Sequence, residues 1–226
     1  MHAAKGCALL ARDAIGQDPD AILRVVLALL KVLAVPRTEE ALATSSLREA
    51  KIECRAGCNA CCHQNVEVSI PEAILVALQV ADPADPRRAS ILETTDAVAG
   101  LGLAERIRTG RPCPLLVDGR CSVYDNRPLL CRATLSSDAK GCYDALHGRG
   151  TAAIYPIAQF VAAADRDALR GICKDIGLQY DNVELVRTVA AILRDPTTVV
   201  RWAGREDVFE PAQAVVRNPA KAKRTT

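Results

Sequence analysis

The chain has 226 residues, ten of them cysteines, and its 29 Lys and Arg nearly balance its 27 Asp and Glu. This balance excludes the strong overall field that draws a protein to nucleic acid or to an anionic membrane. Aromatic residues make up only 3% of the chain, which leaves few stacking platforms for single-stranded nucleic acid and suits helix-on-helix packing. We therefore expect a mainly helical protein with no nucleic-acid partner.

The N-terminal region predicts helices rather than a signal peptide or a membrane span. Its most apolar stretch, from Ala21 to Val35, is too short to span a bilayer comfortably and contains Arg24 and Lys31. Acidic residues precede this stretch and no clear cleavage context follows it. We expect a cytoplasmic protein with no membrane contact, in which so many cysteines serve as metal ligands rather than as disulfides.

Helix starts are marked by aspartate followed by proline, which supplies an N-cap acceptor and a residue suited to the first helical turn. These pairs are Asp18-Pro19, Asp82-Pro83, Asp85-Pro86 and Asp195-Pro196. Ser69 to Glu72 and Asp181 to Glu184 have the pattern of a capping box. With the apolar periodicity, these signals predict helices over residues 19–34, 38–51, 71–81, 86–99, 127–136, 156–176, 181–194 and 196–204.

Strand signals are few and lie near the cysteines. Residues 115–117 and 121–124 flank the turn sequence Asp118-Gly119, which predicts a small β-hairpin. Residues 66–70 alternate apolar and polar side chains, and we expect this short strand to join the hairpin.

Seven of the ten cysteines fall into two groups with spacings typical of metal sites. Thiolates two or three residues apart on a tight loop converge on one ion, and a distant group completes the coordination sphere once the chain folds. A later cysteine brings the candidates to eight, enough for two Cys₄ zinc sites, or for one Cys₄ iron–sulfur cluster with ligands left over. The candidate metal ligands are Cys54, Cys58, Cys61, Cys62, Cys113, Cys121, Cys131 and Cys142.

The adjacent pair Cys61 and Cys62 bears on the number of metals. If both bound one tetrahedral ion they would close a very small, strained ring, so either they serve two metals or only one of them is a ligand. Thiolate sites of either kind carry net negative charge. We expect neighbouring arginines to offset this charge, namely Arg55, Arg120, Arg127 and Arg132.

The other candidate residues have simpler interpretations. Cys7 and Cys173 are expected to be small buried hydrophobic side chains. His63 follows the cysteine pair and is either a ligand or an ordinary loop side chain. Tyr124, in the return strand of the predicted hairpin, is expected to pack beside the site.

These motifs resemble the YkgJ-type CxxCxxCC family, which is described as a zinc- or iron-chelating domain. After the first cysteine group, the similarity continues through Cys113-Pro114, Gly119, Cys121, Val123-Tyr124, Arg127-Pro128 and Cys131-Arg132, and ends near Cys142 and His147-Gly148. It covers residues from about 51 to 149. Family members often carry an aromatic shortly after Cys-Arg, whereas Ala133, Thr134 and Leu135 follow here. This departure does not affect the thiolates.

We therefore expect a helical bundle that embraces a small cysteine-rich metal-binding module with a short β-hairpin, all in one domain. N-terminal helices would occupy residues 1–50, the metal-binding module 51–149, C-terminal helices 150–210, and a flexible tail 211–226.

The leading functional interpretation is a metal-binding protein that coordinates zinc or an iron–sulfur cluster through its cysteines. One alternative is a structural zinc module that mediates protein interaction. Another is an enzyme, because some larger proteins with this cysteine domain resemble lysine N-methylases acting on flagellin. Only a lone Gly-x-Gly at Gly100 and Gly102 supports a nucleotide-binding enzyme, and it follows a helical pattern rather than a strand. The sequence assigns no catalytic residue, metal identity or protein partner.

Overall fold

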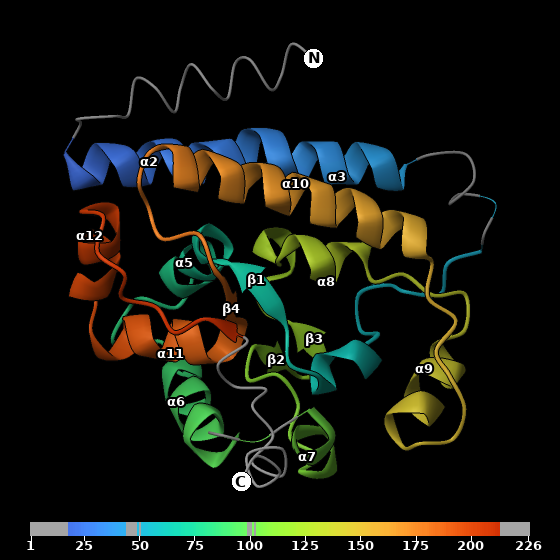
Figure 1. Cartoon of the computed structure of the whole chain (residues 1–226). Helices are drawn as coiled ribbons and strands as arrows, with labels where there is room; N and C mark the ends of the chain where they lie inside the picture. Colours follow the sequence, from blue (N-terminus) through green and yellow to red (C-terminus); the bar gives the residue numbers. More distant parts are fainter. Residues whose placement is uncertain (1–17, 44–48, 50, 99–100, 102, 213–226) are drawn as a thin grey trace, which may run out of the picture.

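The computed structural model describes residues 18–43, 49, 51–98, 101 and 103–212 (Figure 1). Helices dominate this part of the chain, and two small antiparallel sheets of two strands accompany them. The helices are α2 (Pro19–Leu29), α3 (Val35–Leu42), α5 (Ile70–Leu78), α6 (Arg87–Val98), α7 (Leu103–Arg108), α8 (Leu129–Ala133), α9 (Ala139–Leu146), α10 (Pro156–Asp175), α11 (Leu185–Arg194) and α12 (Thr197–Ala203). The prediction of a mainly helical fold is confirmed.

Most of the predicted helix starts are correct because their capping residues act locally. The Asp18 carboxylate accepts a hydrogen bond from Ala21 N at 2.9 Å at the start of α2. The Ser69–Glu72 capping box forms at the start of α5, where Ser69 N donates to Glu72 Oε2 at 2.8 Å. The helix predicted over residues 156–176 is α10 almost to the residue.

The break predicted between residues 34 and 38 is wrong. A π-helical segment, η1 (Leu30–Ala34), joins α2 directly to α3, so the helix passes through Pro36. Pro36 has no N–H to donate, and the wider turn just before it accommodates the missing hydrogen bond without ending the helix. The helix α3 ends at Leu42, and much of the remainder of the predicted helix over residues 38–51 lies outside the described residues.

The predicted hairpin is confirmed, but its third strand is not. Strands β2 (Leu116–Val117) and β3 (Arg120–Cys121) pair across a turn in which Asp118 and Gly119 have φ of 49° and 74°. Strand β1 (Glu67–Ser69) pairs instead with β4 (Asn182–Glu184), and Val68 lies opposite Val183. This partner is more than a hundred residues away in the sequence, so no local pattern could identify it.

Residues 181–184, predicted as the start of a helix with a capping box, form β4 and the cap that follows it. The Glu184 carboxylate accepts a hydrogen bond from Arg187 N at 2.8 Å, so Glu184 is itself the N-cap of α11. Two helices, α7 and α9, were not predicted. Both are short, and α9 contains Gly141, which weakens its helical signal.

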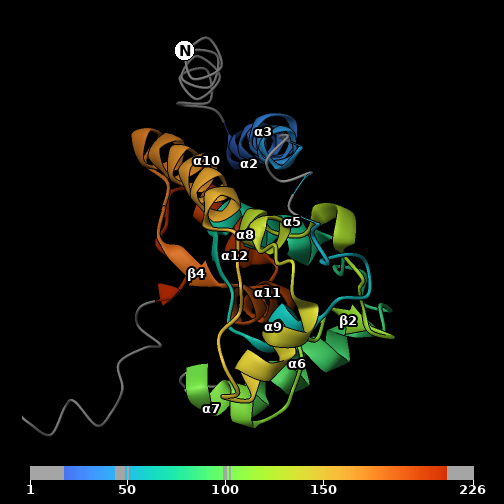
Figure 2. The same ribbon diagram turned by 90° about the vertical axis from the view of Figure 1, so that its right-hand side faces the viewer.

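The long helices form one side of the molecule. The segment η1 and helix α3 run beside α10, and α8 lies against both α3 and α10 (Figures 1 and 2). Thr38 Oγ1 donates to Asp165 Oδ2 at 3.1 Å in the buried contact between α3 and α10. The helix α11 packs on α5 and α6, and α12 on α2, with the Trp202 ring fully buried. This framework supports the segments that carry the cysteines.

Among the described residues, no helix is both long enough and apolar enough to cross a membrane.

Candidate metal centre

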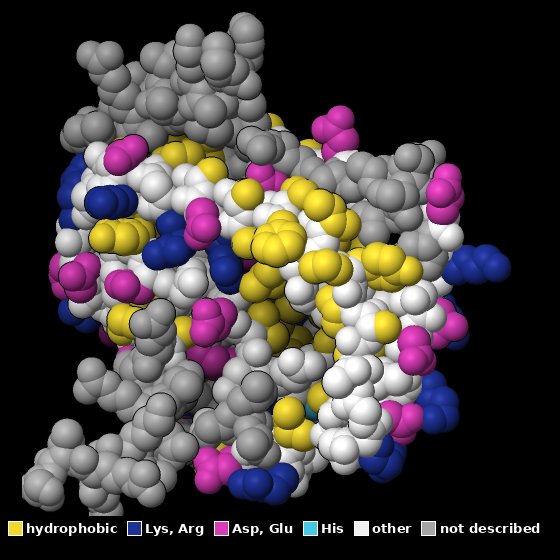
Figure 3. Space-filling view, turned by 45° about the vertical axis from the view of Figure 1, so that its right-hand side comes forward, with side chains coloured by type: hydrophobic (Ala, Val, Ile, Leu, Met, Phe, Trp, Pro, Cys, Tyr) yellow, Lys and Arg dark blue, Asp and Glu magenta, His cyan; other side chains and the backbone are white. Residues whose placement is uncertain are grey.

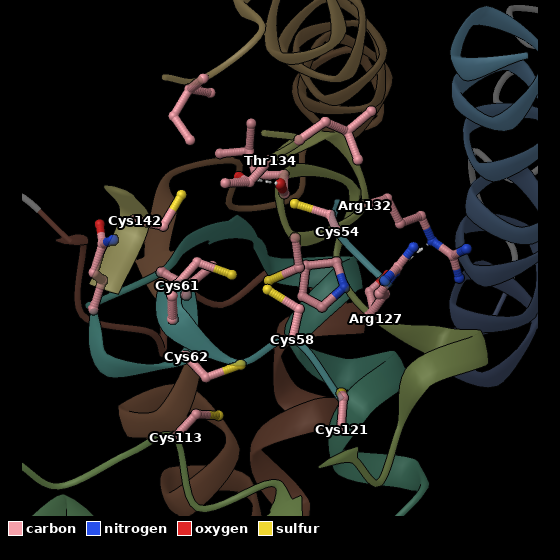
Figure 4. Close-up of a pocket in the computed structure, with 18 of the residues that line it drawn as sticks. Cys54, Cys58, Cys61, Cys62, Cys113, Cys121, Arg127, Arg132, Thr134 and Cys142 are labelled. Atoms are coloured by element: carbon pink, nitrogen blue, oxygen red, sulfur yellow. Dashed lines mark hydrogen bonds between the residues drawn. The ribbon is translucent and has the colours of Figure 1, made fainter. Parts of the chain in front are cut away.

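All eight predicted ligands line one cavity of about 520 Å³. The molecule is hollowed on one face, where hydrophobic side chains gather (Figure 3). The cysteines of the cavity come from the loop after residue 51, the 3₁₀ turn η2 (Ala60–His63), the segment leading into the hairpin, strand β3, and helices α8 and α9 (Figure 4). Segments that are distant in the sequence therefore converge on the same space.

The first cysteine group lies on a tightly curled backbone. Cys58 N donates to Arg55 O at 2.9 Å, and Gly57 has a φ of 95°, a conformation that glycine adopts without strain. Cys61 and Cys62 follow on η2. Ser136 N donates to Cys54 Sγ at 3.2 Å, which fixes the first thiol of the group against the segment after α8.

The second group surrounds the hairpin. Cys113 N donates to Cys62 O at 2.6 Å, so the two groups meet through the backbone at this point. Cys121 lies in β3 opposite Leu116, whose N–H bonds to Cys113 O at 2.9 Å. Cys131 lies in α8, as predicted, and Cys142 lies in α9, which packs against η2.

Burial and mutual repulsion control the chemistry of these thiols. Burial raises the pKa of Cys113 to about 12 and the pKa of Cys131 well above its ordinary value. The hydrogen bond between the Cys61 and Cys62 thiols lowers the pKa of Cys61 to about 7 and raises that of Cys62. A set of buried thiols of this kind becomes a set of thiolates only when positive charge is supplied to it.

Part of that positive charge comes from arginines. Arg55, Arg127 and Arg132 line the cavity, as predicted, whereas Arg120 is exposed and lies outside its lining. The prediction for Arg120 is wrong because β3 directs alternate side chains to opposite faces, and Cys121 takes the inner one. The charge of Arg127 contributes to the lowered pKa of Cys61.

Two of the arginines that line the cavity, Arg127 and Arg132, are held in place by their neighbours. The Arg127 guanidinium lies 3.9 Å from the centroid of the Tyr124 ring, and Tyr124 lines the cavity as predicted. The buried Arg132 side chain forms an ion pair with Glu39 of α3 at 2.5 Å. Its Nε donates to Arg127 O at 3.0 Å, so Arg132 also fixes the backbone that carries Arg127.

The remaining candidates lie away from the cavity or outside the described residues. His63 is not part of the lining, and its Nδ1 lies 3.4 Å from Ala60 O. Cys173 is buried in α10, where burial raises its pKa to about 12, as expected for a cysteine that acts as a hydrophobic side chain. Cys7 and the glycines Gly100 and Gly102 lie outside the described residues.

Two residues that hold the cavity together were not identified from the sequence as site residues. The Asn59 side chain accepts a hydrogen bond from Tyr143 Oη of α9 and donates to Gly119 O of the hairpin turn at 3.4 Å. Glu72, beyond its role in the capping box, accepts from Leu129 N at 2.8 Å at the start of α8. The sequence signals the local bond of Glu72 but gives no signal for these distant partners.

Among the described side chains, no three His, Cys, Asp or Glu already stand in a metal-coordinating arrangement. The donor set nevertheless suits zinc and iron, because thiolates are soft ligands that both zinc and iron–sulfur clusters accept. The cationic wall of the cavity fits the negative charge that such a thiolate site carries.

Residues 53–152 match the model of a protein family described as "CxxCxxCC: Putative zinc- or iron-chelating domain". The match covers all eight cysteines of the cavity and confirms the resemblance stated from the motifs. Searches of curated proteins and of solved structures gave no match to this chain.

Proposed function

We propose that this protein binds zinc or an iron–sulfur cluster through the eight cysteines of the cavity. The observation that carries the proposal is the convergence of all eight on one space from segments up to 88 residues apart, between Cys54 and Cys142. The match of residues 53–152 to a family of chelating domains supports it.

The arrangement also indicates what a bound metal would do for the fold. The cavity joins η2, the hairpin, α8 and α9, and these short elements, apart from α8, have almost no buried side chains of their own. A thiolate-bound metal would cross-link them, and the free energy of binding would become free energy of folding. Zinc would supply a fixed tetrahedral link, whereas an iron–sulfur cluster would add electron transfer.

The test is anaerobic purification of the full chain, followed by quantification of metal and acid-labile sulfide and by a visible absorption spectrum. Zinc without sulfide, in a colourless protein, would establish a zinc protein. Iron with sulfide, in a brown protein, would establish an iron–sulfur protein. Protein that contained neither metal, and whose thiols all reacted freely without unfolding, would overturn the proposal.

A matched control is available in Cys173→Ser. Cys173 is buried away from the cavity, so this variant should retain the full metal content. Cys113→Ser should reduce it.

A further inference from the structure

We propose that the eight cysteines form two separate four-cysteine sites, with the boundary between Cys61 and Cys62. This inference rests on the proposed function and assigns each ligand to one metal centre. The loop site consists of Cys54, Cys58, Cys61 and Cys142. The hairpin site consists of Cys62, Cys113, Cys121 and Cys131.

The loop site is assembled by contacts between the segment around residues 53–61 and the start of α9. Glu53 N donates to Ser136 O at 2.9 Å, and Ala139 N donates to Glu53 Oε2 at 2.8 Å. The Asp138 carboxylate caps α9 through Gly141 N at 2.7 Å, and Tyr143 Oη donates to the Asn59 side chain. These bonds join the segment that carries Cys54, Cys58 and Cys61 to the segment that carries Cys142.

The hairpin site is assembled by a different set of bonds. Cys113 N donates to Cys62 O, Leu116 N to Cys113 O, and Ser122 N to Leu115 O at 2.8 Å. The Glu72 carboxylate fixes the start of α8 through Leu129 N, two residues before Cys131. The Asn59 side chain also donates to Gly119 O, which connects the loop site to the hairpin.

The positions of the labelled cysteines agree with part of this division. In Figure 4 the Cys62 and Cys113 side chains lie together, apart from those of Cys54 and Cys142.

The adjacency of Cys61 and Cys62 explains why the boundary falls there. Two neighbouring residues cannot comfortably chelate one tetrahedral ion, but they can direct their sulfurs into two neighbouring sites. In the structure the Cys62 carbonyl accepts a hydrogen bond from Cys113 N of the second group, and η2, which carries both cysteines, packs against α9. The pair is therefore the covalent link between the two sites.

The test uses the metal-free full chain, titrated anaerobically with Co²⁺ as the probe. Native mass spectrometry counts the tightly bound ions, and sulfur-to-cobalt charge-transfer absorption shows thiolate ligation. The unmodified chain should bind two ions. The double variants within one site, C54S/C142S and C113S/C121S, should each retain one ion, whereas C54S/C113S should retain none. C173S is the matched control and should bind two.

Coupling within and between the sites gives a second readout. Two substitutions in one site should lower the number of bound ions no further than either substitution alone. For substitutions in different sites, the losses of bound ions should add. Far-ultraviolet circular dichroism and the emission of the fully buried Trp202 monitor the fold of each variant.

A shared polynuclear centre would overturn the proposal. In that case C54S/C142S and C113S/C121S would each lose all the bound Co²⁺, or C54S/C113S would retain an ion. Failure of the proposed function would look different, since the unmodified chain would then bind no Co²⁺ and would contain neither zinc nor iron when purified.

Discussion

Arg127 is the cationic side chain with the most direct electrostatic effect on the cysteines. It lines the cavity, stacks on Tyr124 and lowers the pKa of Cys61 after the larger effect of the Cys62 hydrogen bond. Its Nε is buried and has no hydrogen-bond partner in the described structure. Its contribution to the cavity is therefore its positive charge rather than a structural hydrogen bond from that atom.

Replacing Arg127 with alanine should weaken metal binding by about tenfold or more, the scale found for residues that support metal ligands. The physical reason is the loss of a positive charge beside thiolates that gather negative charge. Competition with a chromophoric chelator measures the change in affinity. The matched control is Arg120→Ala, because Arg120 lies in the same segment but is exposed and outside the cavity. Equal affinities in the two variants would contradict this role for Arg127.

At this scale, the sequence identifies residues whose chemistry depends on local spacing. The eight cysteines were predicted correctly to come together, because their spacing within each group and the turn at Asp118 and Gly119 are local features. Asn59 could not be identified, since Tyr143 is its partner only after α9 packs on η2. Arg120 was misassigned because the sequence does not show which face of β3 lies inward.

Among the helices and strands, Glu72 joins three elements through one buried carboxylate. Oε2 accepts from Ser69 N and Ser69 Oγ at the junction of β1 and α5, and Oε1 accepts from Leu129 N at the start of α8. Glu72 is only 3% exposed, so no solvent replaces these bonds when they are lost. It is therefore an anchor for the helix that carries Cys131.

Glu72→Ala should lower the free energy of unfolding by about 3 kcal/mol, because buried donors are left without an acceptor. Urea denaturation followed by circular dichroism measures this change. Glu93→Ala is the control, since Glu93 is exposed and forms a surface ion pair with Arg111, and it should change stability by about 0.5 kcal/mol or less. Equal midpoints and slopes for the two variants would show that Glu72 has no anchoring role.

The elements differ in how far the sequence specifies them. Helix starts with a capping residue, such as Asp18 and Ser69, were predicted because the cap and its partner lie within three residues. The pairing of β1 with β4 was missed because it depends on a contact across more than a hundred residues. The helix through Pro36 was missed because a π-helical turn absorbs the defect that proline usually causes.

For the whole molecule, the division between the helical framework and the cysteine cavity predicts an uneven response to loss of metal. The apolar core includes Trp202, the inner faces of α5 and α11, and Leu129 and Ala133 of α8, whereas η2, the two hairpin strands and α9 have almost no buried side chains of their own. Metal binding should therefore stabilise the cavity segments far more than the framework.

Removal of the metal with a strong chelator should increase amide hydrogen exchange in residues 53–66, 111–128 and 134–149 and leave α11 and α12 protected. Mass spectrometry of peptides from the exchanged protein measures this, and the emission of Trp202 should remain that of a buried ring. If amide exchange increased uniformly along the chain, or did not change in the segments that carry the cysteines, the division between framework and cavity would be contradicted.

The most direct test of metal binding by the cysteines is X-ray absorption at the metal edge of the full chain as purified under anaerobic conditions. We predict a first coordination shell of sulfur alone, at about 2.3 Å for zinc, or sulfur with a second shell of iron for a cluster. A first shell dominated by nitrogen or oxygen would contradict the assignment of the cysteines as the ligands.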